Sequence, residues 1–165
     1  LIARAIAVEL GLSADEVGMI EASGQLHDIG KSEVSLEYLR KPSALDEDEY
    51  REVQRHPELG ARIIHCSPAL LELIPGVLYH HERYDGAGYP FGLGGVEIPL
   101  SARVIAVADT YDAMTSDRVY RPALSHIDAT LELERHQGAQ FDERVVNAAL
   151  AARLDLITLD YTERD

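Results

Sequence analysis

The spacing of the apolar residues most strongly constrains the fold of this 165-residue chain. Apolar residues recur one helical turn apart, as at Ile2, Ile6 and Leu10, and no pair of segments alternates with the two-residue period of half-buried strands. Only the stretch 86–95 breaks the pattern, because it holds five of the twelve glycines, which is typical of a loop. The sequence therefore predicts an all-α fold, a single bundle of about seven helices.

Local signals place the helix boundaries. Ser13 and Glu16 form a capping box, which predicts a helix over 14–28. Gly11 is expected to end a first helix that begins upstream of Leu1. Cap residues and first-turn prolines predict further helices over 46–56, from 57, over 67–81, and from 125 and 142. The apolar run within 101–114 could form a buried strand, but its length favours a buried helix.

The charge of the chain restricts its partners. It has 15 basic and 29 acidic residues, a formal charge of -14 and a pI of about 4.8. Such a surface repels polyphosphate backbones, so duplex nucleic acid and anionic membranes are not expected partners. A small anion could still bind if divalent metal ions supplied the positive charge.

The single cysteine, Cys66, cannot form an internal disulfide, and the chain shows neither a signal peptide nor a run of about 18 apolar residues. These features predict a cytoplasmic protein. Because the chain begins with Leu1 instead of methionine, we expect it to be part of a longer protein.

Two groups of histidines stand next to acidic residues. His27 is followed by Asp28, and His80-His81-Glu82 precedes the glycine-rich stretch. Adjacent helical residues diverge by roughly 100°, so His80 and His81 could bind metal together only at a helix terminus or through two ions. The alternative is a half-buried pair that is hydrogen-bonded to carbonyl groups.

Asp109 lies within the apolar run 104–114, where an unpaired carboxylate would cost several kcal/mol of desolvation. It therefore needs a partner, which could be a metal ion or a neighbouring Arg118. Asp112, three residues further on, lies on nearly the same helix face and is expected to stabilise the helix or support the ligands.

Imidazole and carboxylate ligands without a thiolate suit Mn, Fe, Zn or Ni better than Ca or an iron–sulfur cluster. Two such ions can share a hydroxide nucleophile and neutralise a phosphodiester. Lys31, Arg118 and Arg121 are then natural partners for phosphate oxygens, although each could equally be ordinary surface charge.

The order and spacing of these motifs resemble the HD-GYP domain of the HD superfamily of metal-dependent phosphohydrolases. The resemblance covers residues 1 to 150, about nine-tenths of the chain, and the block from His80-His81-Glu82 to Gly88-Tyr89-Pro90 is its most specific part. The His-Asp dipeptide alone is shared by a very large hydrolase superfamily. The other matching segments are 27–31, 41–42, 56–60, 92–93, 95, 98–99, 102–109, 112–118, 120–121 and 138–142.

The resemblance implies a phosphodiesterase that opens cyclic di-GMP to linear pGpG, and in some members onward to GMP. It implies two or three divalent ions, with Fe or Mn placed before Ni or Zn, and Asp28 and Lys31 as catalytic residues. The implied metal ligands are His27, Asp28, His56, His80, His81 and Asp109. The implied substrate-binding residues are Lys31, Arg118, Arg121, Asp85, Gly88 and Tyr89.

The resemblance also implies a domain over 1–153 with a C-terminal tail over 154–165. Expected partners are cyclic di-GMP, an upstream receiver or sensor domain, a GGDEF-type cyclase and a second copy of the chain. Family members carry one more histidine ligand, which would fall about five residues before Leu1. Three alternatives stay open at this point: a non-catalytic sensor of cyclic di-GMP or protein-interaction module, a hydrolase of another nucleotide, and a helix bundle without a metal site.

Overall fold

The computed structural model describes residues 1–117 and 122–155, and within them the fold is all-α, as the sequence predicts. Nine α-helices and three 3₁₀ helices occur in these ranges. The α-helices are α1 (Ile2–Glu9), α2 (Ala14–Leu26), α3 (Leu36–Leu39), α4 (Glu47–Val53), α5 (His56–His65), α6 (Ile74–Tyr79), α7 (Leu100–Thr115), α8 (His126–Arg135) and α9 (Glu143–Ala151). The 3₁₀ helices are η1 (Ile29–Glu33), η2 (Pro68–Leu73) and η3 (Gly95–Glu97).

Several predicted helix boundaries are confirmed. Capping boxes begin α2 at Ser13 and α4 at Asp46, and Gly11 has a φ of 73° at the turn after α1. The side chains of Ser125 and Asp142 accept backbone hydrogen bonds at the starts of α8 and α9. The apolar run over 101–114 is the buried helix α7.

The predicted helix over 67–81 is wrong in one respect, since it is divided into η2 and α6. Pro75 lies in the first turn of α6, where it cannot donate a backbone hydrogen bond and so favours a new helix start over continuation. The helix predicted to end at Asp28 ends at Leu26, and the one predicted to reach His56 ends at Val53. The four-residue α3 was not predicted.

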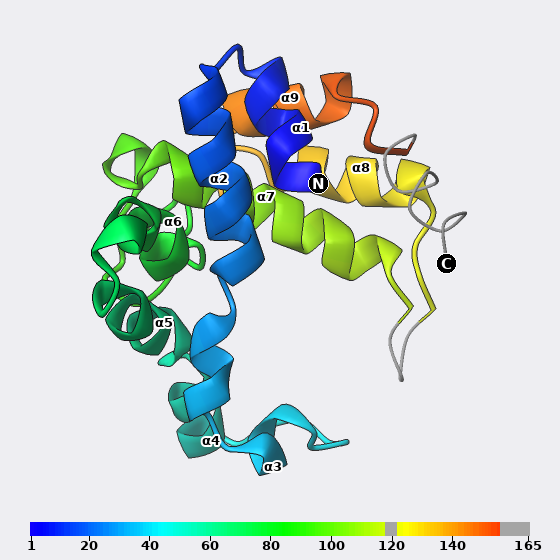
Figure 1. Cartoon of the computed structure of the whole chain (residues 1–165). Helices are drawn as coiled ribbons and strands as arrows, with labels where there is room; N and C mark the ends of the chain where they lie inside the picture. The colour runs from blue at the N-terminus through cyan, green and yellow to red at the C-terminus, as the bar shows by residue number, and fades with distance from the viewer. Residues whose placement is uncertain (118–121, 156–165) are drawn as a thin grey trace, which may run out of the picture.

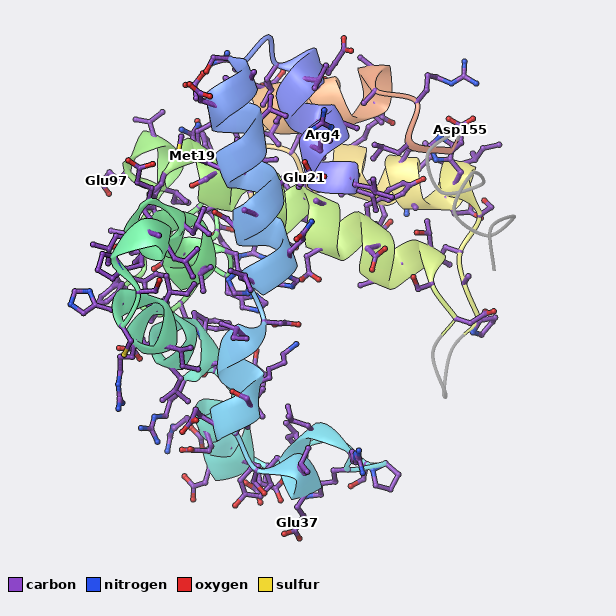
Figure 2. The ribbon with its side chains drawn as sticks, in the orientation of Figure 1. Arg4, Met19, Glu21, Glu37, Glu97 and Asp155 are labelled. Atoms are coloured by element: carbon purple, nitrogen blue, oxygen red, sulfur yellow. The ribbon has the colours of Figure 1, made fainter. Side chains whose placement is uncertain are left out.

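The main core lies between α1, α2, α7, α8 and α9. Ile6, Val107, Tyr111 and Leu133 are fully buried there. Leu154, the first residue of the predicted tail, is also buried in this core. In Figure 1, α7 runs through the centre of the molecule, and α1, α8 and α9 lie above it in this view. An ion pair of 2.9 Å between Arg4 and Glu21 links α1 to α2 at the surface (Figure 2).

A second group of helices packs against this bundle. Helix α6 contacts α2 and α7, and α5 contacts α6 and η1. Helices α3 and α4 contact each other at the end of the molecule opposite α8 and α9 (Figure 1). None of the helices in the described ranges has the length and apolar character needed to cross a membrane. The fold thus places the ends of α2 and α6 and the start of α5 beside the middle of α7.

Candidate metal centre

The structure brings all six predicted metal ligands together. His27 and Asp28 follow the last residue of α2, and His56 begins α5. His80 and His81 follow α6, and Asp109 lies in the second half of α7. The shortest separations between side chains of the cluster are 3.3 to 3.5 Å, and the rings of His80 and His81 lie 4.1 Å apart.

Three of the histidines are oriented in the same way. The Nδ1 atoms of His27, His56 and His80 lie 2.7 to 2.8 Å from the carbonyl oxygens of Gly24, Val53 and Val77. Each carbonyl lies three residues before its histidine in the last turn of a helix, where carbonyl groups lack an intrahelical partner. A neutral ring in this arrangement carries its proton on Nδ1 and directs the lone pair of Nε2 into the cluster.

The convergence of these lone pairs explains why the cluster suits a cation. The Nε2 atoms of His56 and His80 lie 3.3 Å apart, and with both protons on Nδ1 neither ring can donate to the other. His27 Nε2 and Asp28 Oδ1 are buried without a hydrogen-bond partner. Buried polar atoms in proteins rarely lack a hydrogen-bond partner, so we expect a bound group to contact these two atoms.

The ligand atoms form two overlapping groups that fit metal coordination. One group contains His56, His80 and His81, and the other contains His27, Asp28 and His80, each with its ligand atoms within 4.8 Å of one another. The two oxygens of Asp28 face different histidines: Oδ1 lies 3.4 Å from His56 Nε2, and Oδ2 lies 3.5 Å from His27 Nε2. Asp109 Oδ1 lies 3.5 Å from His27 Nε2, so a histidine is one of its described neighbours.

Burial and neighbouring charges keep most of the histidines neutral. Burial lowers the pKa of His56 and His80, and it lowers the pKa of His81 to about 3 with help from His56. Burial also disfavours the charged form of His27, but Asp109 and Asp28 outweigh this effect and raise its pKa. Burial acts to raise the pKa of Asp109, yet its interaction with His27 dominates and lowers that pKa to about 2. Neutral imidazoles and ionised carboxylates are the forms that bind metal ions.

Close backbone packing holds the cluster together at Gly30. A Cβ atom at this position would lie 2.0 Å from the carbonyl oxygen of His56 and 2.5 Å from the nitrogen of Gly60. The absence of a side chain therefore lets η1, which follows Asp28, pack directly against α5, which begins with His56. This contact was not predictable from the sequence, since a glycine that follows a helix is common wherever the chain turns.

Five of the six predicted substrate-binding residues fall into three groups, and the sixth, Gly88, packs against the backbone of 81–83. Lys31 Nζ donates a hydrogen bond of 2.6 Å to Asp28 Oδ2, and the ring of Tyr89 stacks on His81 at 4.8 Å, so both lie at the cluster. Asp85 is paired with Arg83 and accepts a hydrogen bond from the backbone of Ala87. Arg118 and Arg121 lie outside the described residues.

An all-α bundle that gathers a His-Asp pair, three further histidines and a distant aspartate has the residues expected of an HD domain. A sequence model of the HD domain family matches residues 1–145. This chain therefore belongs to the HD domain family, whose members depend on metal ions, and the predicted resemblance to HD-GYP proteins is confirmed.

Two curated relatives and one solved structure illustrate the similarity. The chain is 43% identical over 157 residues to the cyclic di-GMP phosphodiesterase response regulator RpfG of Xanthomonas campestris, covering 94% of this chain and 42% of that protein. It is 38% identical over 163 residues to 3'3'-cGAMP-specific phosphodiesterase 3 of Vibrio cholerae, covering 99% of this chain and 34% of that protein.

A cyclic GMP-AMP specific phosphodiesterase from V. cholerae matches the fold with a TM-score of 0.72 at 19% sequence identity, covering 91% of this chain and 41% of that one. At this identity the match supports the fold alone. The chain spans less than half the length of each of these three proteins.

Proposed function

We propose that this chain is the catalytic domain, over residues 1–153, of a phosphodiesterase that hydrolyses cyclic di-GMP to linear pGpG, with GMP as a further product. The observation that carries the proposal is the convergence of buried, unpaired ligand atoms from His27 and Asp28 with the ring nitrogens of His56 and His80. The similarity to a cyclic di-GMP phosphodiesterase over 94% of this chain supports the substrate.

We further propose that the six clustered residues bind two or three divalent ions, Fe or Mn in preference to Ni or Zn. Nitrogen and oxygen donors without a thiolate support this choice of metals. When bound, such ions neutralise the phosphate and make hydroxide available at neutral pH. Six clustered ligand residues exceed the four of a typical single-ion site, which supports at least two ions.

The reaction itself is a hydrolysis. An oxygen from water bonds to phosphorus, the bond from phosphorus to the 3′ oxygen breaks, and that oxygen takes up a proton. A cyclic phosphodiester thereby becomes a 5′ phosphomonoester and a 3′ hydroxyl group. The net charge of -14 requires positive charge at the site, since a cyclic dinucleotide carries two negative phosphates.

The chain's own residues take distinct parts in this proposal. Asp28 would bridge two ions, because its two oxygens face different histidines. Lys31 is 40% exposed while it holds Asp28, so its ammonium group can also contact a phosphate oxygen near the point of attack. Arg118 and Arg121 are proposed phosphate-binding residues on the sequence alone, and Gly88 and Tyr89 are proposed to border the substrate. Asp85 remains a predicted substrate-binding residue, although its bonds to Arg83 and Ala87 favour an indirect contribution.

A second candidate substrate is 3'3'-cGAMP, since a relative specific for it is 38% identical over nearly the whole chain.

We also propose a cytoplasmic location, a C-terminal tail over 154–165, an upstream receiver or sensor domain, contact with a GGDEF-type cyclase, and a homodimer. The location rests on the single cysteine and the lack of a recognisable signal peptide, and the other proposals rest on the family resemblance. The length of the curated relatives is consistent with additional domains.

The test is a chromatographic assay of anaerobically purified protein loaded with Fe(II) or Mn(II). Cyclic di-GMP and 3'3'-cGAMP are supplied separately, and products are followed over time. We expect metal-dependent formation of pGpG, and a loss of at least about a hundredfold in Asp28→Ala, since even residues behind metal ligands affect activity by about 10- to 100-fold. Asp15→Ala, on the exposed first turn of α2, serves as the matched control.

Two outcomes would contradict the proposal. Full activity in Asp28→Ala would exclude the mechanism. Binding of cyclic di-GMP without any product, repeated on protein extended upstream by about twenty residues, would favour a non-catalytic sensor.

A further inference from the structure

Glu82 is a buried acidic residue directly after the metal-ligand pair His80-His81. Its side chain is only 3% exposed. Its Oε1 accepts a 2.7 Å hydrogen bond from the backbone nitrogen of Phe91, and its Oε2 accepts one of 3.0 Å from that of Leu93. A buried carboxylate is costly unless it is paired, so these two bonds tie residue 82 firmly to the loop that follows Pro90.

The same loop carries Tyr89, which lies against a predicted metal ligand. The Tyr89 ring stacks on the His81 ring with centroids 4.8 Å apart and an interplanar angle of 21°. The Tyr89 backbone nitrogen donates a 3.2 Å hydrogen bond to the His81 carbonyl oxygen. Tyr89 is therefore fixed on one side by His81, and the residues that follow it are fixed by Glu82.

Gly88 makes this close approach possible. A Cβ atom on Gly88 would lie 2.3 Å from the nitrogen of Arg83 and 2.6 Å from Cα of Glu82. The loop backbone thus lies directly against the backbone of 81–83, with no room for a side chain between them. Displacement of the loop would consequently move the Tyr89 ring relative to the cluster.

We propose that Glu82 is a positioning residue, which holds the 88–93 loop so that Tyr89 forms one wall of the substrate site above His81. The inference rests on the proposed phosphodiesterase function and adds a residue to it. Both oxygens of Glu82 accept backbone hydrogen bonds, and Glu82 belongs to neither group of clustered ligand atoms. Its role is therefore in binding the substrate and not in holding the metal.

The first test measures steady-state kinetics and metal content of Glu82→Gln. Gln keeps the shape of Glu82, but its amide nitrogen cannot accept the second hydrogen bond. We expect KM to rise about tenfold, as for loss of one charged hydrogen bond, with kcat and metal content nearly unchanged. Glu97→Gln is the control, because Glu97 is exposed and lies at the outer edge of the molecule (Figure 2).

A double-mutant cycle asks whether Glu82 acts through Tyr89. If it does, Glu82→Gln should have little further effect on KM in a Tyr89→Ala background. If the increase in KM of the double variant equalled the product of the increases in the two single variants, the proposal would be overturned. Loss of metal in Glu82→Gln alone would also overturn it.

A second measurement needs neither substrate nor metal. The chain contains no tryptophan, so Tyr89→Trp introduces a single fluorescent reporter over His81. We expect Glu82→Gln in this background to shift the emission to the red and increase quenching by acrylamide, while Glu97→Gln leaves both unchanged. Unchanged emission and quenching in Glu82→Gln would overturn the proposal even if the unsubstituted chain proved inactive toward cyclic dinucleotides.

Should Glu82→Gln fail to fold, Glu82→Asp replaces it in both measurements. Asp retains the charge but is one methylene shorter, so it is expected to fold while loosening the loop. A KM and an emission spectrum equal to those of the unsubstituted protein would then contradict the proposal.

Discussion

The apolar core and the histidine cluster both contain fully buried side chains but differ in what completes them. In the core, Ile6, Tyr111 and Leu133 are fully buried, and nearly every group around them is apolar. In the cluster, His56 is 1% and His80 2% exposed, and their Nε2 lone pairs face each other. The core is complete once the helices have packed, whereas the cluster keeps His27 Nε2 and Asp28 Oδ1 without a hydrogen-bond partner, and a cation would satisfy both atoms.

The two regions also differ in how closely their backbones approach. The core uses alanines such as Ala3, Ala7 and Ala149, whose methyl groups fill the space between helices. Around the cluster, Gly30 and Gly88 would place a Cβ within 2.0 to 2.3 Å of neighbouring backbone atoms. Substitutions far from the cluster should therefore change the free energy of unfolding without changing metal affinity. Substitutions of the glycines beside the cluster should change both.

The largest effect is expected from Gly30→Ala. The added Cβ would overlap the His56 carbonyl oxygen, so η1 must move away from α5 and carry Asp28 with it. We expect metal affinity to fall at least about a hundredfold and the free energy of unfolding to fall by about 1–3 kcal/mol. Calorimetric metal titration and thermal melting measure these two quantities.

Gly18→Ala is the matched control. It lies within α2 with no atom within 4 Å of the added methyl group. It should stabilise the protein by about 1 kcal/mol, because alanine is the better helix former, and leave metal affinity unchanged. Unaltered metal affinity in Gly30→Ala would show that the cluster does not depend on this contact.

An intermediate effect is expected from acidification of the metal-free protein. The pKa values of His56, His80 and His81 are lowered from 6.5, so below pH 6.5 the unfolded chain binds more protons than the folded one. Stability should therefore fall as the pH drops from 6.5 toward about 3, where His81 titrates, by up to about 1.4 kcal/mol per pH unit for each proton.

His27 acts in the opposite sense, because its pKa is raised; its contribution is present at low pH and is lost as the pH rises through that value. The stability that His27 gains at low pH only partly offsets the stability that the other three histidines lose. Melting curves at about pH 7.5 and pH 5 measure the net effect of the four histidines, and we expect the lower melting temperature at pH 5. Equal melting temperatures would contradict the assigned burial of the three rings.

The smallest effect is expected from Ser13→Ala, at the opposite end of α2 from His27. This change removes the side-chain cap that accepts from the Glu16 backbone. The free energy of unfolding should fall by about 1 kcal/mol, as measured by denaturant unfolding, without a change in metal affinity or turnover. A parallel loss of metal binding would mean that the two ends of α2 are coupled, contrary to the separation described above.

Local sequence signals predicted much of the fold because they act over a few residues. The capping boxes at Ser13 and Asp46 and the buried α7 belong to this group. The division at Pro75 was not predicted because Ser67-Pro68 already forms a complete helix-start signal, and a second first-turn proline follows only seven residues later. The four residues of α3 are too few for periodicity to indicate a helix.

The ligand types and order were predictable from the family resemblance, and the structure brings those residues together. Their orientation was not predictable, since the Nδ1 contacts depend on where α2, α4 and α6 end. A histidine that directly follows a helical segment is a sequence signal that could have indicated this orientation of the ring. Contacts between distant segments, such as Gly30 with His56 and Glu82 with Leu93, leave no local pattern in the sequence.

The central claim is that the buried histidine cluster binds divalent metal ions. Its most direct test is calorimetric titration of the metal-free chain with Mn(II), comparing His56→Ala with His65→Ala. These two histidines occupy the two ends of α5, one buried in the cluster and the other exposed. The account predicts metal binding to the unsubstituted chain that is retained in His65→Ala and weakened at least about tenfold in His56→Ala. Equal affinity in the two variants, or no binding at all, would contradict it.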